Sequence, residues 1–186
     1  FVIDTHNNLN CFSLKDGSKI WSFSTERSFV NSFKKLSIIF KDQSVIFNNS
    51  LGDITAVDII NGSLLWQIST QNSKIFEDIM SLKTSELVEN NNSIYFSNNK
   101  NQFFSIDINS GAINWIQNIS SNVKPGILGS LLLTISDDGY FFVIDKKSGN
   151  IIRITDIFNQ IKSKKKKKIY PIGFIFNLDK LFISTS

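Results

Sequence analysis

The sequence predicts an all-β fold in which four-stranded antiparallel sheets repeat along the chain as the blades of a β-propeller. Three observations predict it. Seventeen Phe residues, together with frequent Val and Ile, favour strands over helices. Glycines that follow apolar runs recur at Gly17, Gly62, Gly111 and Gly149, with separations of 45, 49 and 38 residues, which is the length of a propeller blade. Turn sequences rich in Asn, Asp and Gly separate the apolar runs.

The strands are expected in the order A, B, C, D within each blade, joined by tight turns whose Asn, Asp and Gly residues tolerate positive φ. A first, partial blade supplies strands B to D, three blades follow, and strands A and B begin a fifth. Each copy is expected to have two strand signals ahead of its glycine, and ranges that carry such signals include 1–4, 10–14, 19–23, 35–40, 44–47, 54–58, 63–69, 112–120, 125–129, 131–135, 140–145, 169–176 and 180–184. We therefore expect a single propeller segment over residues 1–186, with blades at 1–30, 31–72, 73–120, 121–161 and 162–186.

A nine-residue motif surrounds each repeat glycine, with Asp four residues before it and Trp four residues after it. The motif residues are Asp58, Gly62, Trp66, Asp107, Gly111, Trp115, Asp145, Gly149, Gly17 and Trp21, while Ser13 and Arg153 replace the first Asp and the last Trp. The glycine can turn strand C into strand D without a Cβ penalty, and the Asp can accept backbone hydrogen bonds around that turn. We expect each Trp to pack across the gap to the next blade, which contributes about 2–3 kcal/mol per blade. The motif thus predicts packing rather than ligand binding.

The run [Ala/Ser]-[Val/Ile]-Asp-x-x-x-Gly-x-x-x-Trp, as in residues 56–66 and 105–115, resembles the repeat of the PQQ-like, or quinoprotein-type, β-propeller family. Four copies cover nearly the whole chain. Because members of that family are typically eight-bladed rings, the resemblance implies that this chain is about half of a ring. The first and last residues lie inside apolar runs, so we expect further blades, and any signal sequence, in a longer parent chain.

The family offers two functional classes. BamB-like proteins are non-catalytic scaffolds of outer-membrane assembly without a cofactor, and the resemblance is strongest to them. Quinoprotein alcohol and sugar dehydrogenases, the alternative, hold pyrroloquinoline quinone and calcium, and they imply vicinal cysteines, clustered oxygen ligands and long insertions. Cys11 is the only cysteine of the chain and no such ligand cluster is visible. We therefore expect no catalytic, cofactor-binding or metal-binding residues.

Two isolated features have simple interpretations. The stretch Asp137-Asp138-Gly139 is expected to form a hairpin turn rather than a calcium loop, since aromatic residues occupy the next positions. His6 is the only histidine, and nothing beside it suggests catalysis.

Three longer connections between strand D and the next strand A carry additional chemistry. Residues 24–35 combine Phe and Val with Arg and Lys. Residues 72–85 place Ile75, Phe76, Ile79 and Met80 at helical spacing, which suggests an amphipathic turn that forms either a lid on its own blade or a partner-contact loop. Residues 162–169 contain Lys164 to Lys168, which form either a solvated loop or a peripheral contact with anionic lipid headgroups. Nucleic-acid binding is not expected, because no aromatic residue interrupts the lysines.

The sequence is therefore interpreted as a BamB-like scaffold, periplasmic and associated with the outer membrane, that assists assembly and insertion of outer-membrane β-barrel proteins. By resemblance, its protein partner is the barrel-inserting subunit of the assembly machinery. A sensor or adhesion propeller remains a further alternative that the residues do not separate from the scaffold.

Overall fold

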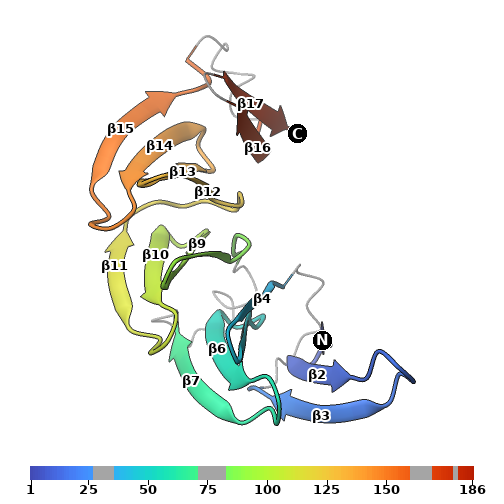
Figure 1. Ribbon diagram of the computed structural model, residues 1–186. Coiled ribbons are helices and arrows are strands. Elements are labelled where there is room, and N and C mark those ends of the chain that lie inside the picture. Colours follow the sequence, from blue (N-terminus) through green and yellow to red (C-terminus); the bar gives the residue numbers. More distant parts are fainter. Residues whose placement is uncertain (27–35, 71–82, 160–168, 178–179) are drawn as a thin grey trace. The chain divides into compact units, whose positions relative to one another are not determined.

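The computed structural model describes residues 1–26, 36–70, 83–159, 169–177 and 180–186. Every regular element in these ranges is a β-strand, and the strands form antiparallel sheets of up to four strands (Figure 1). The all-β fold and the four-stranded blades expected from the sequence are confirmed. No helix capable of crossing a membrane occurs in the described part of the chain.

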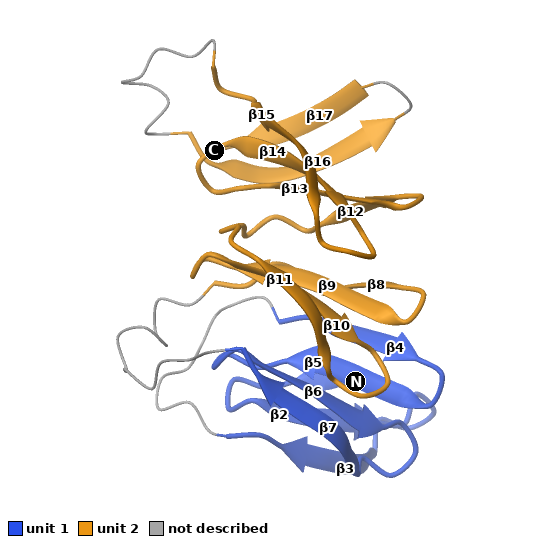
Figure 2. Ribbon diagram, turned by 90° about the vertical axis from the view of Figure 1, so that its left-hand side faces the viewer, with its two compact units in different colours: residues 1–82 blue, residues 83–186 orange. Residues whose placement is uncertain are grey.

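The chain divides into two compact units, residues 1–82 and 83–186 (Figure 2). The first unit contains a three-stranded sheet in the order β1-β2-β3 and a four-stranded sheet in the order β4-β5-β6-β7. Its strands are β1 (Val2–Ile3), β2 (Asn8–Phe12), β3 (Lys19–Ser24), β4 (Ile38–Lys41), β5 (Ser44–Asn48), β6 (Asp53–Asp58) and β7 (Leu64–Ser69).

The second unit contains two four-stranded sheets, β8 to β11 and β12 to β15, and the hairpin β16-β17. Its strands are β8 (Val88–Asn90), β9 (Ser93–Asn98), β10 (Gln102–Asp107), β11 (Ile113–Gln117), β12 (Gly126–Leu128), β13 (Leu131–Ile135), β14 (Tyr140–Asp145), β15 (Ile151–Asp156), β16 (Pro171–Asn177) and β17 (Lys180–Thr185).

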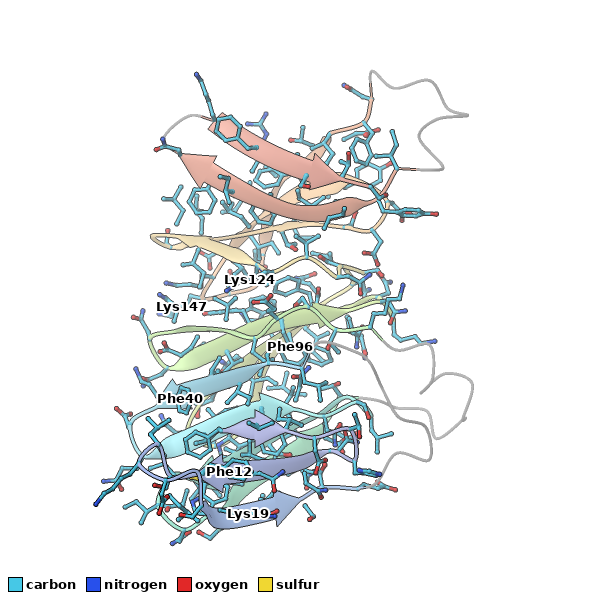
Figure 3. The ribbon with its side chains drawn as sticks, turned by 90° about the vertical axis from the view of Figure 1, so that its right-hand side faces the viewer. Phe12, Lys19, Phe40, Phe96, Lys124 and Lys147 are labelled. Atoms are coloured by element: carbon cyan, nitrogen blue, oxygen red, sulfur yellow. The ribbon has the colours of Figure 1, made fainter. Side chains whose placement is uncertain are left out.

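Each complete blade exposes much of its outermost strand. The middle strands β5, β6, β9, β10 and β13 are mostly buried, whereas β14 is mostly half-buried. In β6 and β10 the four central residues are all buried, whereas β15 is exposed over residues 151–154. Phe96 in the middle of β9 (Figure 3) stacks on Phe104 of β10 with ring centroids 5.0 Å apart. Buried middle strands explain the near-continuous apolar runs that predicted them.

A separate apolar core holds neighbouring sheets together within each unit. In the first unit Leu9, Val45, Phe47 and Val57 form the buried cluster, and Trp21, Phe23, Ile3, Ile38 and Ile59 pack against it. In the second unit the buried cluster is Tyr95, Phe103, Ile119, Leu132 and Ile144, with Trp115, Ile127 and Phe142 against it. Each cluster draws residues from consecutive sheets, as expected for propeller blades.

Two strand expectations differ from the structure. No strand signal covered β8, because Val88–Asn90 is short and contains only one apolar residue. The strand expected over 112–120 ends at Gln117, since the Ile119 amide donates to the Gln117 carbonyl (3.0 Å). The Ser121 hydroxyl, bonded to the Ile135 carbonyl (2.7 Å), then holds a compact loop that leads to β12.

Candidate protein-contact surface

The turn from strand C to strand D has the same construction in every copy. The repeat glycines Gly17, Gly62, Gly111 and Gly149 have φ of 73°, 73°, 73° and 76°. Each glycine amide donates to the carbonyl of the residue four positions earlier, at 2.9 Å. In all four C–D pairs the strand register shifts near the end of strand C, just before this turn. Only a residue that tolerates the left-handed region fits this turn without strain.

The motif Asp closes the turn with its carboxylate. Asp107 Oδ1 accepts from the Asn109 and Ser110 amides (3.1 and 2.9 Å) and from the Ser110 hydroxyl (2.7 Å). Asp145 Oδ1 accepts from the Ser148 amide and hydroxyl, both at 2.7 Å. Hydrogen bonds from the serine hydroxyls, followed by those from backbone amides, hold the pKa of Asp107 and Asp145 below its usual value.

The first copy replaces the Asp with Ser13 and keeps the turn. Ser13 Oγ accepts from the Lys15 amide (3.2 Å), and Asp16 Oδ1 accepts from the Ser18 amide (3.1 Å). Hydrogen bonds from the Ser13 and Ser18 hydroxyls lower the pKa of Asp16. Two short side chains thus share the role that one Asp has in the other copies.

The motif Trp joins consecutive blades in the first unit. The Trp21 indole nitrogen on β3 donates to the Ile59 carbonyl of the next sheet (3.2 Å). The ring lies on the α-carbon of Gly62, where a methyl group at the Cβ position would approach Trp21 Cε3 to 2.6 Å. The ring of Phe1 covers the indole with its centroid 5.4 Å away. The indole is therefore wedged between strand D of one blade and the C–D turn of the next.

The second unit repeats this seam. The Trp115 indole nitrogen donates to the Lys146 carbonyl (3.2 Å), and a methyl group on Gly149 would approach Trp115 Cδ2 to 2.7 Å. Phe103 stacks on Trp115 with centroids 6.0 Å apart. Lys146 strengthens the seam, because its ammonium group donates to Asn90 Oδ1 (2.5 Å) and to the Gly129 carbonyl (2.9 Å). Trp66, the remaining motif indole, is buried.

Sequence reasoning missed the second role of the repeat glycine. Gly62 and Gly149 supply a positive φ and also leave space for the indole of the preceding blade, whereas Gly17 has no atom within 4 Å of its Cβ position. Comparison between copies could have indicated this role. Gly62 and Gly149 each contact the Trp of the preceding copy, and not the Trp that follows by four residues in their own copy.

Because the motif residues are used in turns and seams, partner contacts are expected elsewhere, and the outer edge of each blade is one exposed surface of the described ranges. Strands β7, β11 and β15 end their sheets and pair on one side only. They carry exposed aliphatic side chains, namely Leu64, Leu65, Ile113, Ile116, Ile151, Ile152 and Ile154. An edge strand with unpaired backbone groups and apolar side chains is suited to strand addition by a partner.

The other residues considered from the sequence lie in turns or outside the described residues. Asp137 lies in the turn between β13 and β14, where its carboxylate accepts from the Ser120 hydroxyl (2.9 Å) and the Asn122 amide nitrogens (3.2 and 2.8 Å). The His6 amide donates to Asp4 in a tight turn (2.9 Å). The partner-contact loop Ile75, Phe76, Ile79 and Met80 and the lysine run Lys164 to Lys168 lie outside the described residues.

A metal-assisted quinone site needs clustered oxygen ligands for its cation. Within the described ranges, no three side chains among His, Cys, Asp and Glu gather as a metal site would require. Cys11 is buried and is the single cysteine of the sequence, so the chain has no vicinal cysteine pair. We assign no reaction step to such a cofactor.

Comparison with known proteins places this geometry in a family. The family model described as outer membrane protein assembly factor BamB matches residues 1–155, which contain all four copies of the repeat motif. The chain belongs to the BamB family. No curated protein sequence matches it significantly.

Solved structures show the same fold at low sequence identity. BamB from Moraxella catarrhalis superimposes with a TM-score of 0.67 and 15% identity, over 98% of this chain and 51% of that chain. The computationally designed Ika8 protein gives a TM-score of 0.64 with 14% identity, over 92% of this chain and 48% of its own. The designed Ika4 protein gives 0.60 with 14% identity, over 86% and 94%. The chain thus spans about half the length of the BamB structure.

Proposed function

We propose that this member of the BamB family is a non-catalytic scaffold that assists assembly and insertion of outer-membrane β-barrel proteins at the periplasmic side of the outer membrane. The family match over residues 1–155 is the observation that carries the proposal. The partner is the barrel-inserting subunit of the assembly machinery. The motif Asp, Gly and Trp residues are used in turns and seams, which favours a rigid scaffold over a reaction centre.

Such a scaffold acts by holding binding surfaces in fixed positions. The seams hold consecutive blades together through the packed indole and its hydrogen bond. The edge strands are therefore already ordered, and a partner that binds them does not have to offset their conformational entropy. Partner segments then gain backbone hydrogen bonds at an edge, or apolar contacts on a loop.

Affinity capture tests the proposed partner. The tagged chain is used to capture the purified barrel-inserting subunit of the same organism in detergent. We expect saturable binding by the chain and none by a tagged unrelated β-propeller. Failure to bind this subunit at micromolar concentration would overturn the proposed partner.

An enzymatic assay tests the dehydrogenase alternative. The chain, within its parent protein, is incubated with pyrroloquinoline quinone and Ca²⁺, and alcohol-dependent dye reduction is measured. We expect a rate no higher than that of the quinone alone. Turnover that depends on the protein would contradict the non-catalytic assignment.

A paired substitution tests the partner-contact loop. Phe76→Asp together with Met80→Asp is expected to weaken capture of the barrel-inserting subunit by tenfold or more while the melting temperature stays unchanged, because a contact surface contributes to binding rather than to folding. A lowered melting temperature would instead assign these side chains to the core of the protein.

A further inference from the structure

The outer strand β15 differs from the other edge strands in composition. Four of its six residues are β-branched, Ile151, Ile152, Ile154 and Thr155, and residues 151–154 are all exposed. Proline is absent, and the strand carries only one basic residue, Arg153, near its centre. Natural sheets usually protect such an edge with proline, lysines or a covering segment. β15 therefore has the features of a strand that accepts another strand.

The backbone of β15 is available for pairing on its outer side. The sheet order β12-β13-β14-β15 ends at this strand, and its register with β14 is regular from Tyr140↔Asp156 to Val143↔Arg153. In an antiparallel sheet every second residue of an edge strand directs both its N–H and its C=O away from the sheet. No strand pairs with these groups within the described ranges (Figure 1).

Arg153 specifies the charge of the occupant. It stands where the other three copies have Trp, and it is exposed instead of wedged in a seam. Among the described residues no carboxylate forms an ion pair with its guanidinium group; the ion pair found there joins Lys124 and Glu86. Side chains directly opposite each other on neighbouring strands interact, and opposite charges there are favourable. An acidic residue is therefore the preferred neighbour of Arg153.

The same charge argues against a second copy of this chain as the occupant. Symmetric antiparallel pairing of two β15 strands around their centre would place Arg153 near its own counterpart, and like charges opposite each other are destabilising. In contrast, Ile152 and Ile154, which are 59% and 54% exposed, favour apolar residues on either side of the acid.

We propose that β15 is a docking edge for an extended peptide segment of a protein partner, in which one acidic residue stands between two apolar residues. The segment adds to the sheet as an antiparallel fifth strand beyond β15, its acid opposite Arg153 and its apolar neighbours opposite Ile152 and Ile154. This inference rests on the proposed protein-binding function and names the surface and the chemistry of one of its ligands.

Labelled synthetic peptides test the docking edge on the full chain. The probe is Thr-Val-Thr-Val-Glu-Val-Thr-Val-Thr, and two comparison peptides carry either Lys in place of Glu or N-methyl groups on alternate residues. Fluorescence anisotropy should show that the Glu peptide binds about tenfold more tightly than the Lys peptide. The N-methylated Glu peptide should not bind, because it cannot pair through its backbone.

Charge reversal on the protein makes the test specific. Arg153→Glu should invert the preference so that the Lys peptide binds more tightly, and Arg153→Gln should bring the two affinities together; the second variant serves if the first fails to fold. Leu65→Lys, which alters a similarly exposed side chain on β7, should leave both affinities unchanged.

Three results would overturn the docking edge. They are equal binding of all three peptides, a peptide preference that is the same in Arg153→Glu and the unaltered chain, and dimerisation of the chain through β15 in place of peptide binding. The proposed function is tested separately, because capture of the barrel-inserting subunit by a chain that binds none of the peptides would leave the scaffold role intact and remove β15 as its docking edge.

Discussion

Among individual side chains, two threonines on middle strands differ in whether their hydroxyl group has a partner. Thr55 on β6 is fully buried, and its Oγ1 has no hydrogen-bond partner among the residues that the structure describes. Thr134 on β13 is equally buried, but its Oγ1 lies 3.1 Å from Ser121 Oγ in a hydrogen bond. A buried hydroxyl without a partner costs about 1–3 kcal/mol, because it loses its hydrogen bonds to water on folding.

Replacing each threonine by valine should therefore have opposite effects. Thr55→Val is expected to raise the free energy of unfolding by about 1 kcal/mol, and Thr134→Val to lower it by about 1 kcal/mol, since the second variant also removes a partner of the Ser121 hydroxyl. Urea unfolding followed by circular dichroism measures both. A loss of stability in Thr55→Val would show that its hydroxyl has a partner.

Residue roles were predictable from the sequence where the partners are local. The Asp and Gly of each C–D turn are four residues apart, so turn chemistry alone identifies them. The contact of Trp21 with Gly62 joins residues of different copies, and spacing within one motif contains no information about it. The same holds for the bond between Lys146 and Asn90, which needs the packing of two blades.

Among the structural elements, the C–D turns make folding stability depend on pH. The pKa of Asp107 and Asp145 is lowered in the folded protein from the ordinary value of 3.8, because hydrogen bonds from Ser110 and Ser148 favour the ionised form. A carboxyl with a lowered pKa stabilises the fold fully above its unfolded pKa. That contribution is lost as the pH falls below 3.8 and through the lower folded pKa.

Asparagine at both positions keeps an acceptor oxygen and removes the titration. The double variant Asp107→Asn with Asp145→Asn should be slightly less stable at neutral pH, and its urea midpoint should fall less steeply than that of the unaltered chain between about pH 4 and pH 2. Midpoints measured across this range check the expectation. Identical slopes in the two proteins would contradict a role of these turns in acid sensitivity.

Strands were predictable where burial produces a continuous apolar run, as in β5, β6 and β13, since both faces of these middle strands are covered. β8 was not, because an inner strand of three residues needs only one apolar side chain. The end of β11 was placed too late, since the apolar Ile119 extends the pattern into a loop held by the buried Ser121 hydroxyl. The proposed docking edge could not be located from the sequence. Arg153 departs from the repeat there, but only the structure shows that its side chain is exposed.

At the scale of the whole molecule, the protein is a repeat protein of the BamB family that spans about half the length of the BamB structure it resembles. Stability in repeat architectures is approximately the sum of the repeats and of the interfaces between neighbours. In each unit one pair of neighbouring sheets meets at an indole and a glycine, Trp21 with Gly62 in the first unit and Trp115 with Gly149 in the second. The seams are therefore the interactions on which a rigid scaffold depends.

A double-mutant cycle at the first seam tests whether the indole and the glycine act together, with Trp21→Ala, Gly62→Ala and the double variant unfolded in urea. Gly17→Ala is the matched control, because Gly17 has the same φ of 73° and no atom within 4 Å of its Cβ position. Gly62→Ala alone should cost the strain of a positive φ, about 1–2 kcal/mol, and in addition the displaced indole.

In the Trp21→Ala background the cost of Gly62→Ala should fall to that of Gly17→Ala, which gives a coupling free energy of about 1 kcal/mol or more between Trp21 and Gly62. Gly17→Ala should cost the same in both backgrounds. Strict additivity of Trp21→Ala and Gly62→Ala would contradict the seam, because the indole and the glycine would then contribute to stability independently and not as one joint between blades.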